Sequence, residues 1–352
     1  MVIVIGADVH KATHTFVAVD EVGRRLGEKT VRATTGGHEA ALRWARRELP
    51  GELRWGIEDC RHLSARLERD LLAAGQDVVR VPPKLMAQSR ASSRERGKSD
   101  PIDAMAVARA VLREPGLPVA SHDESTRELK LLVDRREDLV SERTRQINRL
   151  RWHLHELDPE FDVPVKGFAI GKQRRRVADW LDGRTGLVAE LARDILADIG
   201  QGSIRIDDLE KRITALVQDR YRHLLAIPGC GPLTAAKIAG ETANVNRFRS
   251  EACFAMNAGV APLPVWSGNT RGRVRMSRTG NRQLNAALHR IAVTQIRLDG
   301  LGRAYYRKRL DHGDSTVEAL RCLKRRLCRI VFHALHADQR PAHIPSSLPL
   351  TA

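Results

Sequence analysis

The sequence predicts an α/β domain at the N-terminus, followed by a long helical region and a basic, mainly helical C-terminal region. Apolar residues alternate with a period of two along the first segments of the chain, and segments of helical and strand periodicity then follow in turn. After Pro118 the apolar spacing is helical over long stretches. These two observations define the predicted fold class.

Residues 1–118 contain, in order, three strands, a helix, a strand, a helix and a strand. The predicted strands are 2–9, 14–22, 29–35, 53–58 and 77–81, and the predicted helices are 38–48 and 63–74. Three antiparallel strands followed by α/β crossovers form the strand sequence of the ribonuclease H-like fold. A polar, basic stretch over 88–99 then leads to another helix, with Asp100 expected as its N-cap and Pro101 as its first helical residue.

Residues 119–220 are predicted to form a helical arm. A long charged helix is expected over 125–157, and a basic, glycine-containing break over 166–176 separates it from a second helix over 187–217. Arg136 and Arg143 interrupt an apolar seam with a 3.5-residue repeat, made of Val133, Val140, Ile147, Leu150, Leu154 and Leu157. This spacing predicts a coiled coil for oligomerisation or for bracing nucleic acid, although two helices packing only on each other would show the same periodicity.

Residues 221–345 are predicted to form a third domain. The segment LLAIPGCGPLTAAKIAGE, starting at Leu224, is typical of a helix-hairpin-helix motif. Its glycines predict that the backbone amides of Gly229 and Gly231, with the following helix N-terminus, face a phosphate. A tight turn with no ligand would carry the same Gly-x-Gly pattern.

Charge is the strongest compositional signal. The 352 residues carry a net charge of +17, and the part from Val265 onward holds 17 Lys and Arg against 5 Asp and Glu, a net of +12. Clustered basic charge is the electrostatic footprint of a phosphate-binding surface. The densest segment, 266–282, contains no acid and has five arginines: Arg271, Arg273, Arg275, Arg278 and Arg282. Aromatic residues make up only 4% of the chain, so we expect backbone contacts to dominate over base stacking.

Composition also excludes several classes of protein. The five cysteines form no CxxC pair, which argues against a disulfide framework and a thiolate zinc site. No segment has the length and apolarity of a membrane span, and the N-terminus runs into a strand pattern instead of a signal peptide. We therefore expect a cytoplasmic, nucleoid-associated protein without a membrane partner.

Four carboxylates stand where a metal-dependent nuclease would need them: Asp8 on the first strand, Glu58 at the end of the fourth, and Asp100 with Asp103 one helical turn apart. Carboxylate oxygens from several elements are what Mg²⁺ requires, and two such ions can support phosphodiester transfer. Asp100 could also be only a helix cap, and Asp59 could replace Glu58 in this set. His10 and His14 are four residues apart but flank a strand turn and not a helix, and His153 and His155 would lie on opposite helix faces, so both pairs are expected to be structural or solvated.

Five blocks in this order resemble the IS110-type transposases over nearly the whole chain: GADVHK, GIEDC, GKSDPIDAMAVAR, IPGCGPLTAAKI and WSGNTRGRVRMSRTGNRQLNAALH. The resemblance implies a RuvC-like N-terminal domain and a C-terminal transposase domain. Asp8, Glu58, Asp100 and Asp103 would then form a magnesium-binding DEDD tetrad. One departure is the segment 59–62, DCRH, where family members often have small residues.

The resemblance also implies a nucleophilic serine, which its place in the block puts at Ser267. It further implies guidance by a structured bridge RNA, recombination of duplex DNA, and a dimer or tetramer in which one subunit's acids work with another's serine. From the residues alone, Ser267-Gly268 indicates a turn with no adjacent general base. Ser277 is a rival nucleophile.

Two other functions stay open on the sequence. A Holliday-junction-type endonuclease would use the same acids with water as the nucleophile. A non-catalytic nucleic-acid-binding scaffold would use only the arm and the basic C-terminal region.

Overall fold

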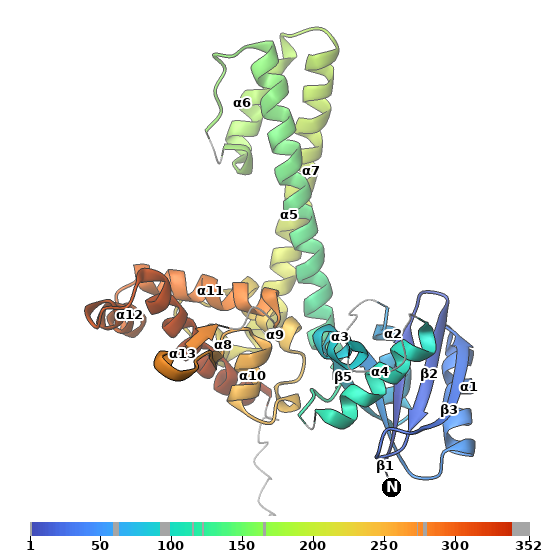
Figure 1. Ribbon diagram of the computed structural model, residues 1–352. Helices are drawn as coiled ribbons and strands as arrows, with labels where there is room; N and C mark the ends of the chain where they lie inside the picture. The colour runs from blue at the N-terminus through green and yellow to red at the C-terminus, as the bar shows by residue number, and fades with distance from the viewer. Residues whose placement is uncertain are drawn as a thin grey trace, which may run out of the picture. The chain divides into compact units, whose positions relative to one another are not determined.

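Figure 1 shows the chain as a computed structural model, which describes residues 2–58, 63–91, 99–114, 116–121, 123–164, 167–272, 274–276 and 280–339. The chain forms two compact units. The first comprises residues 1–123 and 246–253, and the second comprises 124–245 and 254–352. No helix within the described residues is both long enough and apolar enough to cross a membrane.

The first unit is built on a five-stranded mixed sheet with the order β3-β2-β1-β4-β5. Its strands are β1 (Val2–Val9), β2 (Thr13–Val19), β3 (Arg25–Arg32), β4 (Glu52–Glu58) and β5 (Asp77–Val81). β2 is antiparallel to both β1 and β3, whereas β1, β4 and β5 run parallel. The predicted succession of antiparallel strands and α/β crossovers is confirmed.

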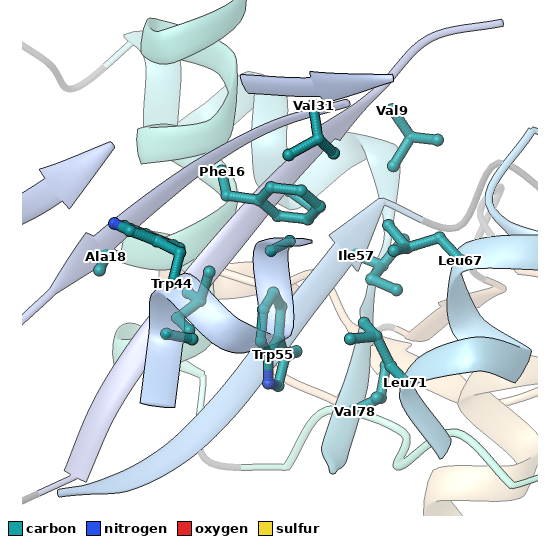
Figure 2. Close-up of a cluster of buried hydrophobic side chains, with 14 of the residues drawn as sticks. Val9, Phe16, Ala18, Val31, Trp44, Trp55, Ile57, Leu67, Leu71 and Val78 are labelled. Atoms are coloured by element: carbon teal, nitrogen blue, oxygen red, sulfur yellow. The ribbon is translucent and has the colours of Figure 1, made fainter. Parts of the chain in front are cut away.

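Helices cover both faces of this sheet. They are α1 (Thr35–Glu48), α2 (Ala65–Ala73), α3 (Pro83–Ala91) and α4 (Asp100–Arg113). On the face of α1 and α2, alternate strand residues such as Phe16 and Trp55 form a core with Trp44 of α1 (Figure 2), and the two rings of Phe16 and Trp55 meet edge to face. On the other face, valines of β1, β2 and β5 pack against α3 and α4.

Two helix starts differ from the prediction. α1 begins at Thr35 because the side chain of Thr34 accepts a hydrogen bond from the amide of Gly37, 3.2 Å away, which caps the helix earlier than expected. In α4 the N-cap is Ser99 and not Asp100, so the prediction was wrong by one residue. Asp100 is already helical, with Pro101 behind it in the first turn.

The second unit contains two 34-residue helices, α5 (Glu124–Leu157) and α7 (Leu187–Arg220), which lie side by side along their length (Figure 1). The two arginines that interrupt the apolar seam have partners on α7. Arg136 donates to Glu210 Oε1, with a 2.8 Å bond from Nε, and Arg143 donates to Ser203 Oγ at 3.1 Å. At these two positions the contact between α5 and α7 is therefore polar, whereas the rest of the seam is apolar.

A short 3₁₀ helix (Gly167–Ala169) and α6 (Gly171–Asp182) occupy the segment where the sequence predicted only a break. The prediction was wrong because the run of basic residues hides an amphipathic helix. Val177 and Leu181 of α6 are fully buried in a core with Leu150 and Leu154 of α5. Lys172, Arg175 and Arg176 are exposed, and Arg174 donates to the carbonyl of Phe168 at 2.8 Å, so the charge of α6 did not exclude helix formation.

The chain after α7 is mainly helical, and all of it except residues 246–253 belongs to the second unit. Its elements are α8 (Arg222–Leu225), α9 (Pro232–Thr242), α10 (Glu251–Asn257), a two-stranded sheet of β6 (Pro262–Pro264) and β7 (Val274–Met276), α11 (Arg282–Arg297), α12 (Leu301–Asp311) and α13 (Thr316–Gln339), with short 3₁₀ helices at Val245–Arg247 and Gly268–Thr270. α11 packs against α9, α12 and α13.

Candidate active site and basic block

Two glycines allow α4 to lie directly on the sheet. A Cβ atom at Gly6 of β1 would lie 2.0 Å from the carbonyl oxygen of Ala104, and a Cβ at Gly56 of β4 would lie 2.6 Å from Val111 Cγ2. Larger residues would push the helix away. The glycine of GADVHK and that of GIEDC therefore set the distance between the sheet and α4.

This packing brings the predicted carboxylates to one place. Side chains alternate across a strand, so Asp8 and Glu58 lie on the same face as Gly6 and Gly56, which is the face that α4 covers. Ala7 pairs with Ile57, which places Asp8 and Glu58 at the neighbouring carboxyl ends of β1 and β4. Asp100 and Asp103 come from the first turn of α4.

Asp8 is the central carboxylate of this group. It is 7% exposed, and burial raises its pKa above the usual value. His10 opposes that shift, whereas the negative charges of Asp103 and Asp100 add to it. A buried carboxylate with two carboxylates as neighbours is an arrangement that a cation would stabilise.

His10 belongs to the same cluster, which the sequence analysis missed. Its Nε2 lies 3.0 Å from Asp8 Oδ2 and 3.5 Å from Asp100 Oδ1. One ligand atom from each of Asp8, His10 and Asp100 lies within 4.8 Å of the others. The sequence does indicate this position, since His10 follows Asp8 by two residues at the end of a predicted strand.

His14 lies on the opposite side of the sheet. Its ring stacks on that of His38 of α1, with 5.2 Å between the centroids, and His38 Nδ1 is 2.5 Å from Asp70 Oδ2 of α2. Burial, and next the neighbouring His38, lower the pKa of His14 to about 4. The expectation that His14 is structural agrees with its burial in the hydrophobic layer, and it forms no pair with His10.

The predicted serine and arginines lie in the second unit. Ser267 and Arg271 are exposed on the segment that links β6 to β7, Arg275 is exposed on β7, and Arg282 is the first residue of α11. Arg273, Arg278 and Ser277 lie outside the described residues, as does Asp59. The structure thus presents Ser267 and two of the arginines on one exposed segment.

A buried polar network fixes the end of that segment. Glu241 of α9 accepts hydrogen bonds from Lys130 Nζ of α5 at 2.8 Å and from Asn281 Nδ2 at 2.5 Å. Asn281 in turn caps α11 by accepting from the amides of Gln283 and Leu284. The basic segment is therefore tied to the helical core at its C-terminal end.

The Gly-x-Gly hairpin lies between α8 and α9. Gly229 has a positive φ of 85°, and a Cβ there would meet Thr294 Cβ of α11 at 3.0 Å, so close packing on α11 already explains this glycine. Gly231 is the N-cap of α9 with open space around its Cα, and Pro232 follows it. The hairpin's role in phosphate binding stays a prediction.

Comparison with known proteins agrees with the order of these features. A family model of DEDD-type IS110 proteins, described as "Transposase", matches residues 5–159, and the model "Transposase IS116/IS110/IS902 family" matches 221–307. The IS116 44.8 kDa protein of Streptomyces clavuligerus is 28% identical over 96% of this chain and 95% of its own length. The IS900 42 kDa protein of Mycobacterium paratuberculosis is 27% identical over 96% and 97%.

Among solved structures, RuvC of T. thermophilus in complex with a Holliday junction substrate is similar with a TM-score of 0.28 and 16% identity, over 34% of this chain and 100% of its own. The two family regions cover, in their proper order, both the carboxylate cluster and the serine-containing segment. The chain is a DNA transposase that belongs to the IS110 family.

Proposed function

We propose that this transposase cuts and rejoins duplex DNA under the guidance of a structured bridge RNA, with a metal-binding acidic tetrad and a serine nucleophile. One observation carries the proposal. Asp8, Glu58 and the first turn of α4 share one face of the sheet, where Asp8 is buried against Asp100 and Asp103. A divalent cation bound at this cluster would compensate the repulsion between its negative charges.

The donor set fits magnesium. Asp8, Glu58, Asp100 and Asp103 would hold the ion through hard carboxylate oxygens from three elements. Bound there, Mg²⁺ would neutralise charge on the scissile phosphate and increase the nucleophilicity of an attacking oxygen. The protein's own part is to hold Asp8 in a buried position and to bring α4 close through Gly6.

Ser267 is the proposed nucleophile. Its Oγ would attack the scissile phosphorus, the new Oγ–P bond would replace the P–O3′ bond, and the serine proton would leave to solvent while the departing 3′ oxygen takes one up. Rejoining reverses these steps with a different 3′-hydroxyl. The exposed position of Ser267, beside the exposed Arg271 and Arg275, supports access by a phosphate whose charge arginines can offset.

The remaining parts have proposed roles in assembly and binding. We assign residues 1–118 to the RuvC-like catalytic domain, 119–220 to a coiled-coil arm and 221–345 to the transposase domain. The arm would serve dimer or tetramer formation, so that the tetrad of one subunit acts with Ser267 of another. The hairpin at Gly229 and Gly231 and the basic block from Arg271 to Arg282 would bind phosphates of DNA and RNA.

A trapping experiment tests the chemistry. Full-length protein with its copurifying RNA, Mg²⁺ and labelled element-end duplex is analysed on a denaturing gel. We expect a covalent protein–DNA adduct that Ser267→Ala abolishes, and that Ser141→Ala, at an exposed position on α5, leaves unchanged. An adduct that survives Ser267→Ala assigns another nucleophile.

Two further outcomes identify the alternative functions. Cleavage by the wild type without any adduct indicates an endonuclease that uses water. Nucleic-acid binding without strand cleavage, unchanged in Asp8→Ala, indicates a scaffold without catalysis. Sequencing the copurifying RNA after nuclease trimming tests the guide, because a single defined RNA is expected and a random mixture would contradict it.

A further inference from the structure

His10 occupies a fixed position at the open side of the carboxylate cluster. It lies in the turn between β1 and β2, where its amide donates to the carbonyl of Thr13 at 3.0 Å. The amide of Ala33 donates to the carbonyl of Ala12, which ties the same turn to the end of β3. The imidazole is therefore presented by a well-bonded turn and not by a loose loop.

The position of the ring nitrogen matches a metal ligand. Two ligands that each lie about 2.0 to 2.2 Å from one ion can be separated by up to roughly 4 Å. His10 Nε2 lies 3.0 Å from Asp8 Oδ2 and 3.5 Å from Asp100 Oδ1, so each pair could bind a single ion. The His10 side chain is 51% exposed, which leaves room for an ion to enter beside it.

A purely structural role explains less of this geometry. A histidine that only orients Asp8 needs one hydrogen bond, yet Nε2 also points at a carboxylate from a different element, Asp100 of α4. Convergence of donor atoms from β1, the following turn and α4 is the arrangement expected of a coordination site.

We propose that His10 supplies a nitrogen ligand to the metal centre, so that the site takes transition-metal dications such as Mn²⁺ more tightly than Mg²⁺. The inference rests on the proposed metal-binding function of the carboxylates. Mg²⁺ prefers an oxygen-only set and dehydrates reluctantly, whereas transition-metal ions accept imidazole together with carboxylate.

Binding of the metal alone provides the test. Full-length protein without DNA is titrated with Mn²⁺, and electron spin-echo envelope modulation detects ¹⁴N coupled to the bound ion. We expect ¹⁴N modulation in the wild type and its loss in His10→Asn, which keeps a polar side chain but lacks the imidazole nitrogen at the Nε2 position. His10→Ala should weaken Mn²⁺ binding by about tenfold or more while changing Mg²⁺ binding less.

Controls separate the possible results. His155→Ala, at an exposed position on the arm, should keep both the modulation and the affinity, and circular dichroism of His10→Asn should match that of the wild type. Tight Mn²⁺ binding without ¹⁴N modulation would overturn the role of His10 and leave the carboxylate site standing. If Mn²⁺ binds the wild type no better than Asp8→Ala, the metal function itself is refuted.

Discussion

Gly6 and Ala104 are in backbone contact: any Cβ at position 6 would lie 2.0 Å from the Ala104 carbonyl oxygen and 2.5 Å from the Ala108 amide nitrogen. The contact joins β1 to α4, which carry Asp8 and Asp100 respectively. The addition of one methyl group at this contact should therefore alter the proposed metal site without touching a carboxylate.

The first prediction concerns that contact. Gly6→Ala should destabilise the first unit by about 1 to 3 kcal/mol, because overpacking must displace α4. It should also weaken Mn²⁺ binding, since Asp100 and Asp103 move with the helix. Gly36→Ala is the matched control: its Cβ meets nothing within 4 Å and it lies in α1, so stability should stay equal or rise. Thermal unfolding and metal titration of both variants would check this, and normal metal binding by a folded Gly6→Ala protein would contradict it.

The second prediction separates activity from stability at Asp8. Asp8→Asn should lower strand cleavage by more than about a hundredfold, since loss even of indirect metal partners costs 10 to 100-fold. Stability without metal should be unchanged or higher, because burial raises the pKa of Asp8 and the amide removes a desolvated charge from beside Asp100 and Asp103. Cleavage assays and chelator-treated unfolding curves measure the two effects. A large loss of stability would show that Asp8 is mainly structural.

The third prediction concerns pH. The pKa of His14 is lowered to about 4 in the folded protein, from 6.5 in an exposed histidine. Between these two pH values His14 takes up a proton only in the unfolded chain, which favours unfolding. The free energy of unfolding is therefore highest above pH 6.5 and decreases as the pH falls toward 4. The loss at pH 5 should be about 2 kcal/mol.

Urea unfolding followed by tryptophan fluorescence at pH 7.5 and pH 5 measures this effect, since Trp55 is fully buried in the same layer. His14→Phe keeps a ring against His38 but cannot titrate, so its stability should depend less on pH. An unchanged pH dependence in this variant would assign the effect to other groups.

The fourth prediction concerns the network under the basic segment. Glu241→Ala should destabilise the second unit by about 1 to 3 kcal/mol, because Asn281 loses a buried partner and Lys130 keeps only Asp134, 2.8 Å away. The Asn281→Ala effect should not add to it, since the two side chains share a hydrogen bond. Glu142→Ala, at an exposed position on α5, should change stability by less than about 0.5 kcal/mol. Additive losses in the double variant would show that the bond contributes little.

The fifth prediction concerns phosphate contacts. The logarithm of duplex affinity should fall with the logarithm of salt concentration with a slope of about −0.9 for each phosphate neutralised. Arg271→Ala should reduce that slope by about one contact and weaken binding equally for unrelated sequences. Filter binding across a salt series measures the slope. A salt-independent affinity would contradict the proposal that the basic block binds the DNA backbone.

Local pattern alone predicted much of this protein. The short apolar segments predicted the succession of strands along the first unit, and β1 and β2 are apolar enough to be buried on both faces of the sheet. The 3.5-residue repeat likewise predicted α5, and helical periodicity predicted α7, to within a few residues at each end. α6 was missed because its basic residues outnumber its two buried residues, Val177 and Leu181. These two residues become a buried face only when they pack against α5.

The candidate site divides in the same way. The sequence determined which carboxylates stand at strand ends and on the first turn of a helix, because those positions follow from local periodicity. Only the tertiary structure decided that Gly6 and Gly56 let α4 descend onto the sheet, and that His10 lies between Asp8 and Asp100. Distances between residues far apart in the chain depend on how helices and strands pack against one another. The periodicity of a segment shows which of its faces is buried, but it does not show which other element covers that face.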